Sequence, residues 1–340
     1  MLRVALDLAP TRLAAAGVAR YARGVASALA ARDDVAVEEL GGGAALERGT
    51  LARRALAVRQ DVAWYPLGLR RAARARGADV LHLVTLRGPL HDGRPPAVLT
   101  AHDLAPLHHP ETLATWNRLY TRATLARVLG AAAVVVADSA EGADDLDRTF
   151  PWLRIRVVHP GVDPRFLGAP PAGLLPVDGP YVLFVGTPEP RKNLARLAEA
   201  MRGRGERLVL VGAEGWGDAA PDGAVRLGRV DDETLHRLYA HAACLAIPSL
   251  HEGFGYPAVE AMAAGCPVVA STEGALPEVT GGAAVLVDPL DPEAIAAGID
   301  EAVARSAELV EAGRLRAAEL TWEHTADGLV AAYREAIALG

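Results

Sequence analysis

The sequence predicts an α/β protein made of two doubly wound parallel sheets, one in each half of the chain. Short valine-rich runs alternate with amphipathic stretches almost from end to end, which is typical of parallel strands covered by helices on both faces. A length of 340 residues suits two domains of ordinary size. The alternation is interrupted at residues 164–180, where five prolines and three glycines exclude a long regular element.

The expected strands fall into two series. The first series is Leu2–Asp7, Val35–Leu40, Val80–Val84, Ala97–Ala101, Ala133–Ala137 and Ile155–His159. The second series is Tyr181–Gly186, Arg207–Gly212, Ala224–Gly228, Cys244–Ile247, Pro267–Ala270 and Ala284–Val287. Ligands of open α/β sheets bind beyond the carboxyl ends of the strands, so we expect the loops after these strands to carry the functional residues.

This pattern predicts an N-terminal domain over residues 1–165, a linker over 166–180 and a second domain over 181–320. Residues 321–340 predict a terminal helix, because their large side chains recur at helical spacing: Trp322, Leu329, Val330 and Tyr333. Two similar domains in tandem would present the carboxyl ends of both sheets to one central cleft.

The composition excludes several classes of protein. A formal net charge of −7 argues against a general nucleic-acid binder. The two cysteines, Cys244 and Cys266, fall in predicted core segments, so no disulfide framework or metal knuckle is indicated and a cytoplasmic protein is expected. The N-terminus, MLRVALDLAP, has the wrong flanks for a signal peptide. No apolar run approaches the ~20 residues needed to cross a bilayer.

One local patch departs from the acidic average. Eight arginines lie between Arg48 and Arg76 against a single acid, Asp61, with aromatic and aliphatic residues among them. Such a patch fits peripheral contact with an anionic membrane. Solvated helix faces in an arginine-rich chain are the alternative, and both interpretations stay open.

The first residue that points to chemistry is Lys192, the only lysine among 35 basic residues. It lies in the loop VGTPEPRKNL, between a predicted strand and a predicted helix, with Arg191 beside it. A compact ammonium with three donors suits several phosphate oxygens, and two cations together could hold a diphosphate. The alternative is that a single lysine falls there by chance.

A second loop follows the first predicted strand and ends at Gly17, at the start of a predicted helix. Free backbone N–H groups at a helix N-terminus attract phosphate, and glycine allows close approach. The loop lacks G-x-G-x-x-G, which argues against an ordinary NAD site. A plain turn glycine explains Gly17 equally well.

The third and most specific stretch is HEGFGYPAVE, which places Glu252 in a glycine turn and Glu260 in the helix that begins near Pro257. Carboxylates accept from paired hydroxyls, so one glutamate could hold a sugar and the other a ribose. Two surface glutamates beside a tight turn would explain the charges, although not the abundance of glycine.

These residues resemble retaining glycosyltransferases of family 4, which have the GT-B fold and an E-x7-E motif. In the second half the resemblance covers the Lys192 loop, the segment RLGRVDDETLHRLYAHAACLAIPSLHEGFGYPAVEAMAAGCPVVAS and the segment GALPEVTGGAAVLVDPLDPEAIAAGI. In the first half it is looser, through GVARYARGVASAL, TAHDLAPLHHPETL, ADSAEGADDL and VVHPGVDPRF. The resemblance implies two Rossmann-like domains facing a cleft, with the last helix crossing back to the N-terminal domain.

The resemblance also implies roles for residues of the second half. Glu252 would hold the hydroxyls of the donor sugar, and Glu260 would bind the nucleotide ribose. Lys192 would bind the diphosphate. The turn Gly253, Phe254 and Gly255 would present backbone N–H groups to sugar and phosphate. Many family members carry an arginine directly after the strand-end glycine; here that residue is Thr187, and Arg191 would supply the missing charge.

In the first half, His102 matches a family position close to the reacting sugar, and Asp103 follows it on the acceptor side. A histidine there could donate to a sugar hydroxyl or orient the acceptor. A purely structural hydrogen-bonding role is the alternative for His102.

The triplet of Asp145, Leu146 and Asp147 looks like a DxD metal motif. It falls on a predicted amphipathic helix, so we interpret both acids as surface residues. We therefore expect no metal and no cofactor, because cations of the protein would neutralise the leaving diphosphate.

The expected function is transfer of a sugar from a nucleotide-sugar donor, with retention of configuration as the resemblance implies. GDP-mannose is the first choice of donor, with UDP- or dTDP-sugars next. The acceptor would be a glycan, a lipid-linked glycan or a small molecule. A GT-B epimerase or phosphorylase is the nearest alternative, and a non-catalytic nucleotide-sugar-binding partner subunit is the alternative from another class.

Overall fold

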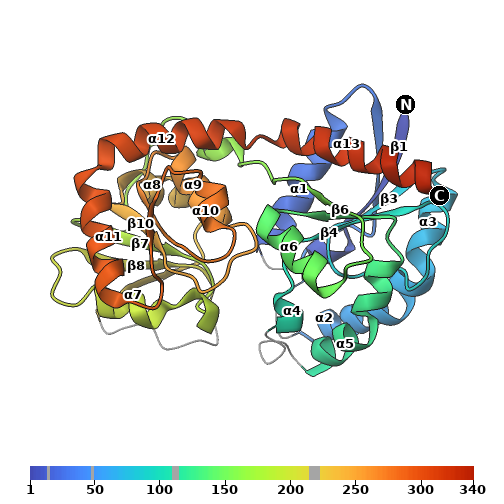
Figure 1. Cartoon of the computed structure of the whole chain (residues 1–340), viewed down its shortest axis with the longest axis horizontal. Coiled ribbons are helices and arrows are strands. Elements are labelled where there is room, and N and C mark those ends of the chain that lie inside the picture. Colours follow the sequence, from blue (N-terminus) through green and yellow to red (C-terminus); the bar gives the residue numbers. More distant parts are fainter. Residues whose placement is uncertain (14–15, 47–49, 109–114, 214–222) are drawn as a thin grey trace. The chain divides into compact units, whose positions relative to one another are not determined.

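A computed structural model describes residues 1–13, 16–46, 50–108, 115–213 and 223–340. The chain forms two compact units (Figure 1). Unit 1 comprises Met1–Gly161 and Trp322–Gly340, and unit 2 comprises Val162–Thr321. No helix of the described residues is both long and apolar enough to span a membrane.

The proline-rich segment expected as a linker belongs to unit 2. The boundary between the units falls at Gly161 and Val162, ahead of the expected linker at 166–180. Phe166 and Val177 of this segment are buried in the core of unit 2. The prolines do prevent regular structure, since only the short turn η4 (Pro164–Phe166) forms there, but two apolar side chains still anchor the segment.

Unit 1 is built on a parallel sheet of six described strands in the order β2-β1-β3-β4-β5-β6. The strands are β1 (Leu2–Asp7), β2 (Val35–Leu40), β3 (Val80–Leu83), β4 (Ala97–Ala101), β5 (Val134–Ala137) and β6 (Ile155–Val157). The helical segments are η1 (Ala9–Arg12), α1 (Ala16–Ala30), α2 (Leu51–Arg59), η2 (Gln60–Gly68), α3 (Leu69–Ala75), α4 (Ala105–His108), α5 (Thr115–Gly130), α6 (Ala140–Thr149) and α13 (Trp322–Leu339).

Unit 2 has a second parallel sheet, of six described strands in the order β12-β11-β10-β7-β8-β9. The strands are β7 (Tyr181–Val185), β8 (Arg207–Val211), β9 (Val225–Gly228), β10 (Cys244–Ile247), β11 (Val268–Ser271) and β12 (Val285–Val287). The helical segments after η4 are η5 (Pro190–Lys192), α7 (Leu194–Ala200), α8 (Asp232–His241), α9 (Tyr256–Ala263), α10 (Leu276–Thr280), α11 (Pro292–Ala304) and α12 (Ser306–Glu319).

Each predicted strand is present, with ends that shift by at most two residues. The central strands are buried along their whole length, as in β4, β5 and β10, because helices cover both faces of each sheet. Both cysteines are free and buried in the core of unit 2. Short apolar runs in the sequence therefore predict the strands, whereas burial on both faces belongs to the central strands and not to the edge strands β6 and β9.

The strand order creates a switch point in each sheet. In unit 1 the chain winds to one side of β1 through β2 and to the other side through β3, so the switch point lies between β1 and β3. In unit 2 it lies between β7 and β10 for the same reason. Loops that leave the carboxyl ends of two such strands diverge and open a crevice, which is where doubly wound sheets bind ligands.

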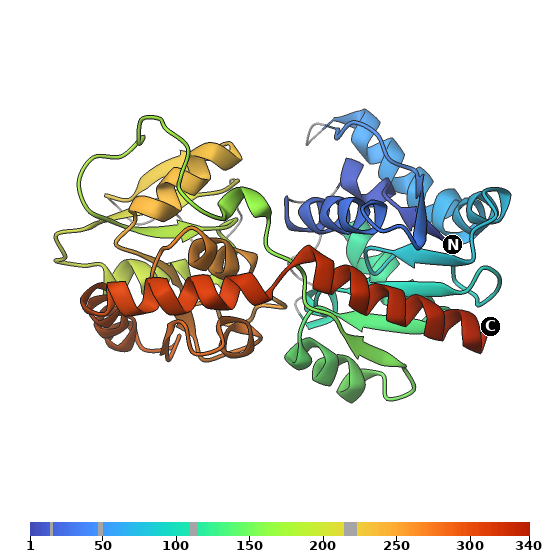
Figure 2. The ribbon, with the colours of Figure 1, turned by 90° about the horizontal axis from the view of Figure 1, so that it is seen from above.

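The last helix, α13, packs against unit 1 beside α1, as Figure 2 shows in the view from above. Gly24 of α1 leaves room for the Trp322 ring, which would collide with any Cβ at that position. The Tyr333 hydroxyl is hydrogen-bonded to Nδ1 of the buried His82 at 2.7 Å. Helix α13 thus completes the core of unit 1 and crosses its strands β3, β4 and β5.

Candidate functional site

The Lys192 loop lies directly after β7, at the switch point of unit 2. Asn193 closes the turn η5 in the left-handed conformation (φ 59°), which asparagine tolerates better than most residues. Its buried side-chain amide donates to the carbonyls of Pro248 at 2.9 Å and Pro289 at 2.6 Å. These two bonds tie the loop after β7 to the loops after β10 and β12.

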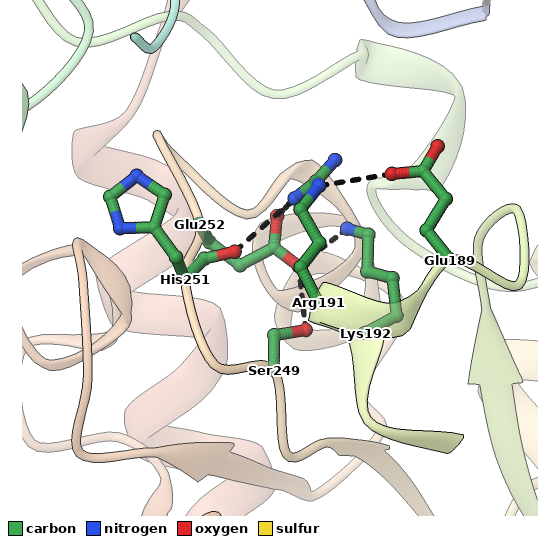
Figure 3. Close-up of polar contacts among 6 residues, drawn as sticks. All are labelled: Glu189, Arg191, Lys192, Ser249, His251 and Glu252. Carbon is green, nitrogen blue, oxygen red and sulfur yellow. Dashed lines mark hydrogen bonds and ion pairs between the residues drawn. The ribbon is translucent and has the colours of Figure 1, made fainter. Parts of the chain in front are cut away.

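The carboxylate of Glu252 lies at the centre of this region (Figure 3). It receives hydrogen bonds from the Lys192 ammonium, from Nη1 of Arg191 at 3.2 Å and from the Ser249 hydroxyl at 2.7 Å. Glu252 is only 6% exposed. Burial alone would raise the pKa of this carboxyl, but the Lys192 and Arg191 cations lower the pKa to about 2. The group is therefore a carboxylate at any physiological pH.

Arg191 spans the whole cluster. Its Nε contacts the Glu189 carboxylate at 3.0 Å, and its Nη1 also donates to the backbone carbonyl of His251 at 3.2 Å. The imidazole of His251 points away from the Glu252 carboxylate (Figure 3). We name the group of Glu189, Arg191, Lys192, Ser249 and Glu252 the glutamate cluster; its formal charges sum to zero.

The glycines of the motif have steric functions. Gly255 caps α9 with φ 90°, and a Cβ there would collide with the Leu276 side chain. Gly274 has φ 67° and lies against the backbone N and O of Glu252, 2.9 Å from the place of a Cβ. The turn that carries Glu252 is thus packed against Gly274, a glycine outside the HEGFGYPAVE stretch.

Glu260 lies inside α9 and is 2% exposed. Its Oε2 accepts a hydrogen bond from the Tyr239 hydroxyl of α8 at 3.1 Å. The helix that carries it begins at Tyr256 with Pro257 in its first turn, as the sequence predicts. The two glutamates of the motif are therefore both buried and both hydrogen-bonded, one in the loop and one on the helix that follows.

The candidate residues of the first half lie in unit 1. His102 follows β4, and its Nδ1 is 2.6 Å from Oδ2 of Asp138, which follows β5. Its Nε2 is 3.1 Å from the carbonyl of Val84. Burial opposes charge on His102, but the carboxylate of Asp138 raises the pKa of the imidazole above its ordinary value. Asp103 is half-buried next to His102 and also favours its charged form.

Gly17 lies in the first turn of α1 and is exposed, and a Cβ added there would meet open space. The residues immediately before this helix, 14 and 15, lie outside the described residues. The structure thus places Gly17 at a helix N-terminus, as expected, without packing that requires glycine.

Sequence reasoning missed Glu189 and Ser249 of the glutamate cluster, Asn193 beside it, and Asp138 beside His102. Asp138 could have been found, because β4 and β5 are adjacent and each is followed directly by a polar residue. Ser249 precedes the motif by two residues, and its role depends on the path of the turn. Asn193 follows Lys192, and the asparagine itself is the only local signal in the sequence for the left-handed turn that it closes.

Among the described residues, no group of three or more His, Cys, Asp and Glu side chains could hold a metal ion. Asp145 of the DxD-like triplet lies on α6 and pairs with the exposed His108 at 2.8 Å. Asp145 therefore has a partner on the surface of unit 1.

Comparison with known proteins identifies the family. Residues 179–305 match the model for glycosyl transferases group 1, and residues 15–166 match the model for glycosyltransferase family 4. The O-antigen chain mannosyltransferase B of Escherichia coli is 33% identical over 267 residues, which cover 70% of each chain. The chain belongs to glycosyltransferase family 4. It is a transferase, as the sequence predicts.

Further relatives of this family 4 enzyme are D-inositol 3-phosphate glycosyltransferases. Those of Segniliparus rotundus and Mycolicibacterium smegmatis are 39% identical over 216 and 209 residues, which cover 54% of this chain. The matched regions cover 47% and 48% of these relatives, so the chain spans about half of their length.

Solved structures confirm the GT-B fold. Sucrose-phosphate synthase from Thermosynechococcus elongatus superposes with a TM-score of 0.73 at 21% identity and covers 100% of both chains. HepE of Anabaena, in complex with UDP-glucose, gives a TM-score of 0.68 at 18% identity over 97% of this chain and 99% of HepE. At these identities the likeness concerns the fold alone.

Proposed function

We propose that this enzyme transfers a hexose from a nucleotide-sugar donor to a hydroxyl acceptor, with retention of anomeric configuration. The observation that carries the proposal is the glutamate cluster. Two cations and a carboxylate converge at the switch point of the unit 2 sheet, the place where doubly wound sheets bind nucleotides.

In this proposal the donor's diphosphate binds to Lys192 and Arg191. A unit charge pair at ~4 Å and an effective dielectric near 20 contributes roughly 4 kcal/mol of attraction before desolvation. Both cations now contact Glu252, so a diphosphate would join an existing charge network and convert its zero net charge to a negative one. Glu252, with one oxygen also held by Ser249, is oriented to accept from a donor sugar hydroxyl.

The reaction then needs little covalent chemistry from the protein. As the glycosidic bond to diphosphate breaks, its electron pair leaves with the diphosphate, and positive charge develops on the sugar. The acceptor oxygen attacks on the same face, and a diphosphate oxygen takes its proton. Lys192 and Arg191 stabilise the leaving charge, which is the electrostatic contribution expected of preorganised cations.

Glu260 would bind the ribose of the nucleotide, together with the turn of Gly253, Phe254 and Gly255. The Glu260 carboxylate is buried, and the hydrogen bond that it accepts from the Tyr239 hydroxyl orients it. GDP-mannose is our first choice of donor, because the E. coli relative is named a mannosyltransferase. UDP-sugars are the second choice, because HepE is described with UDP-glucose.

For the acceptor we propose a pocket of unit 1. A cavity of about 270 Å³ lies beyond β1 and β3, at the switch point of that sheet, and is lined by polar groups that include Gln60, Asp61, Thr85, Arg87 and Asn117. Arg87 donates to the Asp61 carboxylate and to the side-chain amide oxygen of Asn117, so these groups hold one another in place. Carboxylate, amide and hydroxyl groups in one pocket fit a polyhydroxylated acceptor.

We further propose that unit 1 meets an anionic membrane through α2 and η2. Leu51, Val58 and Val62 are 81%, 44% and 58% exposed and share one helix face, and Arg54 and Arg59 line the same surface. The single acid of this arginine-rich stretch is buried, so it does not offset the arginines at the surface. Arg48 lies outside the described residues.

The membrane proposal is tested by sedimentation with vesicles of phosphatidylcholine alone or with phosphatidylglycerol, at low salt. We expect binding only to the anionic vesicles. Val58→Asp with Val62→Asp should abolish it, whereas Leu315→Asp, at a leucine on α12 that is 65% exposed, should not. Absence of binding to anionic vesicles contradicts this part of the proposal.

We propose that transfer requires no divalent metal, since the Lys192 ammonium and the Arg191 guanidinium would contact the diphosphate oxygens in its place. Turnover should persist in excess chelator. Complete loss of turnover that manganese restores would contradict it.

The decisive experiment is thermal-shift titration with GDP-, UDP-, dTDP- and ADP-sugars, followed by assay of nucleotide release. One donor class should raise the melting temperature. Lys192→Ala and Glu260→Gln should lose this shift, and Glu252→Gln should keep most of it while losing turnover. Arg204→Ala, which removes the ion pairs of Arg204 with Glu206 and Asp300 in unit 2, is the matched control and should keep the shift. Equal shifts in all variants would contradict the site.

A further inference from the structure

The position of Asp138 follows from the register of two neighbouring strands. Strands β4 and β5 pair in parallel, with Ala101 opposite Ala137. The next residue on each strand is therefore His102 on one and Asp138 on the other, and both leave the sheet at the same edge. This explains why two side chains 36 residues apart meet at 2.6 Å.

Both nitrogens of the His102 ring face acceptors. The carbonyl of Val84 can only accept a hydrogen bond, so Nε2 carries a proton and donates it at 3.1 Å. On the other side, Nδ1 is 2.6 Å from Oδ2 of the Asp138 carboxylate, a short separation typical of a charge-assisted bond. A ring that donates from both nitrogens is an imidazolium.

The surroundings of His102 favour this state and fix the plane of the ring. Tyr21 of α1 meets the ring edge-on, with the centroids 4.7 Å apart and an interplanar angle of 82°. The other titratable groups that face it are Asp103 in the same loop and His82 on β3. His82 is buried and its pKa falls to about 3, so it stays neutral and does not compete for the charge.

Exposure separates the roles of the two residues. The His102 side chain is 22% exposed, whereas Asp138 is 2% exposed. A substrate can therefore touch His102 but reaches Asp138 only through it. One oxygen of Asp138, Oδ1, has no hydrogen-bond partner among the described residues, so the bond to His102 is the one that the structure gives this carboxylate.

We propose that Asp138 is a positioning residue that keeps His102 doubly protonated, so that His102 serves glycosyl transfer as a fixed cationic hydrogen-bond donor and not as a general base. The role of His102 in glycosyl transfer rests on the proposed function. Its protonation state rests on the geometry alone. An imidazolium has no lone pair with which to take the acceptor's proton. Its Nε2 proton, now directed to the Val84 carbonyl, is the one that a substrate oxygen would share.

The first test is spectroscopic and does not depend on sugar transfer. In ¹⁵N-labelled protein, the His102 ring is assigned by comparison with His102→Gln, and its two nitrogen shifts are followed from pH 5 to pH 9. We expect both nitrogens to be protonated at neutral pH, and Asp138→Asn to move the titration to lower pH. A neutral His102 ring at pH 7 in the parent overturns the proposal.

The matched control is Asp145→Asn. Asp145 also holds a histidine at 2.8 Å in unit 1, but this histidine, His108, is 42% exposed on the surface. The same chemical change there should leave the His102 titration where it is. Equal movement in the two variants overturns the proposal, because it would mean that general surface charge sets the protonation of His102.

The second test is the pH profile of kcat/KM with the donor identified by titration. Activity should fall as pH rises through the pKa of His102, and Asp138→Asn should move that limb to lower pH. At pH values between the pKa of His102 in the variant and its pKa in the parent, the ratio of the variant's kcat/KM to the parent's should fall about tenfold per pH unit. A uniform loss at every pH would indicate a merely structural role and overturns the proposal. If the spectroscopic result holds while no donor supports transfer, the proposed function fails. The proposal for the pair of His102 and Asp138, which we call the dyad, then still stands.

Discussion

Each unit carries a charged cluster at the carboxyl edge of its sheet, and the two clusters have opposite polarity. In unit 2 one buried acid is held by two cations, and the pKa of Glu252 falls to about 2. In unit 1 one histidine is held by one buried acid, and the pKa of His102 rises. In both clusters the acid is the more buried partner, so the comparison teaches that the carboxyl edge of a sheet can fix either a negative or a positive group, according to the number and kind of cations that face the buried acid.

The largest expected effect comes from removing the ammonium of the glutamate cluster. Lys192→Ala leaves Glu252 buried with only Arg191 and Ser249, and breaking such a pair costs about 3 kcal/mol of folding free energy. Loss of a cation aimed at the leaving group should also lower kcat by about 10²–10³. Urea unfolding and initial rates measure the two effects.

Lys192→Arg is the matched control for this prediction. It keeps the charge, so most of the stability should remain, although the planar guanidinium cannot reproduce the contacts of a compact ammonium. If Lys192→Ala were as stable and active as the parent, the glutamate cluster would have neither role.

The second prediction concerns the opposite pH responses of the two clusters. Because the pKa of Glu252 is lowered from 4.5 to about 2, its contribution is present above pH 4.5 and is lost as pH falls towards 2. The shift corresponds to about 3 kcal/mol. The difference in unfolding free energy between parent and Glu252→Gln should therefore shrink over that range.

His102 should respond in the other direction. Its folded pKa is raised, so the stability from Asp138 is fully present below the ordinary pKa of 6.5 and is lost as pH rises through the folded value. Parent and Asp138→Asn should converge in stability at alkaline pH, measured by the same urea titrations. Convergence of this pair at acid pH instead would show that the polarity of the dyad has been misassigned.

The sequence predicts the sheets better than the contacts within the clusters. A strand buried on both faces leaves a short run of apolar residues, so β4, β5 and β10 could be located within a residue. Lys192 and Glu252 could be assigned to one function through their motifs. Their direct contact could not be derived, because it requires β7 to lie beside β10, an order that single strands do not reveal.

The sequence also does not predict that the functional acids are buried. Glu260 occupies an ordinary helix position, and nothing local indicates that it is 2% exposed and faces Tyr239. The proline-rich segment shows the reverse problem, since its composition predicts irregular structure correctly but not its membership of unit 2. Local propensity determines how a segment is shaped, whereas tertiary packing decides where it belongs.

A smaller effect should follow from crowding the turn that carries Glu252. Gly274→Ala would place a Cβ 2.9 Å from the Glu252 backbone at φ 67°, which combines strain with a collision. Gly282, at φ 85°, has no atom near its Cβ position and provides the control. We expect Gly282→Ala to cost about 1 kcal/mol of strain and Gly274→Ala about 2–3 kcal/mol.

The extra cost at Gly274 should also lower turnover, because the carboxylate of Glu252 would move with its backbone. Thermal unfolding and initial rates separate strain from displacement. Equal losses of stability and of turnover in the two variants would mean that the turn is not rigidly packed.

The smallest expected effect concerns the contact between α13 and the surroundings of His102 in unit 1. A buried chain of hydrogen bonds runs from Tyr333 to His82 at 2.7 Å, from His82 to Thr100 at 2.9 Å and from Thr100 to Tyr21 at 2.8 Å, and Tyr21 meets the ring of His102. Tyr333→Phe leaves Nδ1 of buried His82 without its partner, which should cost about 1 kcal/mol of stability.

Tyr120→Phe is the control for this change, since the Tyr120 hydroxyl is buried without a partner among the described residues and its loss should cost nothing. Because the chain ends at a ring contact and not at a bond to His102, Tyr333→Phe should leave the His102 titration in place. A shift of that titration would mean that α13 sets the charge of the dyad through Tyr21, and that unit 1 stabilises its cation through a longer path than Asp138 alone.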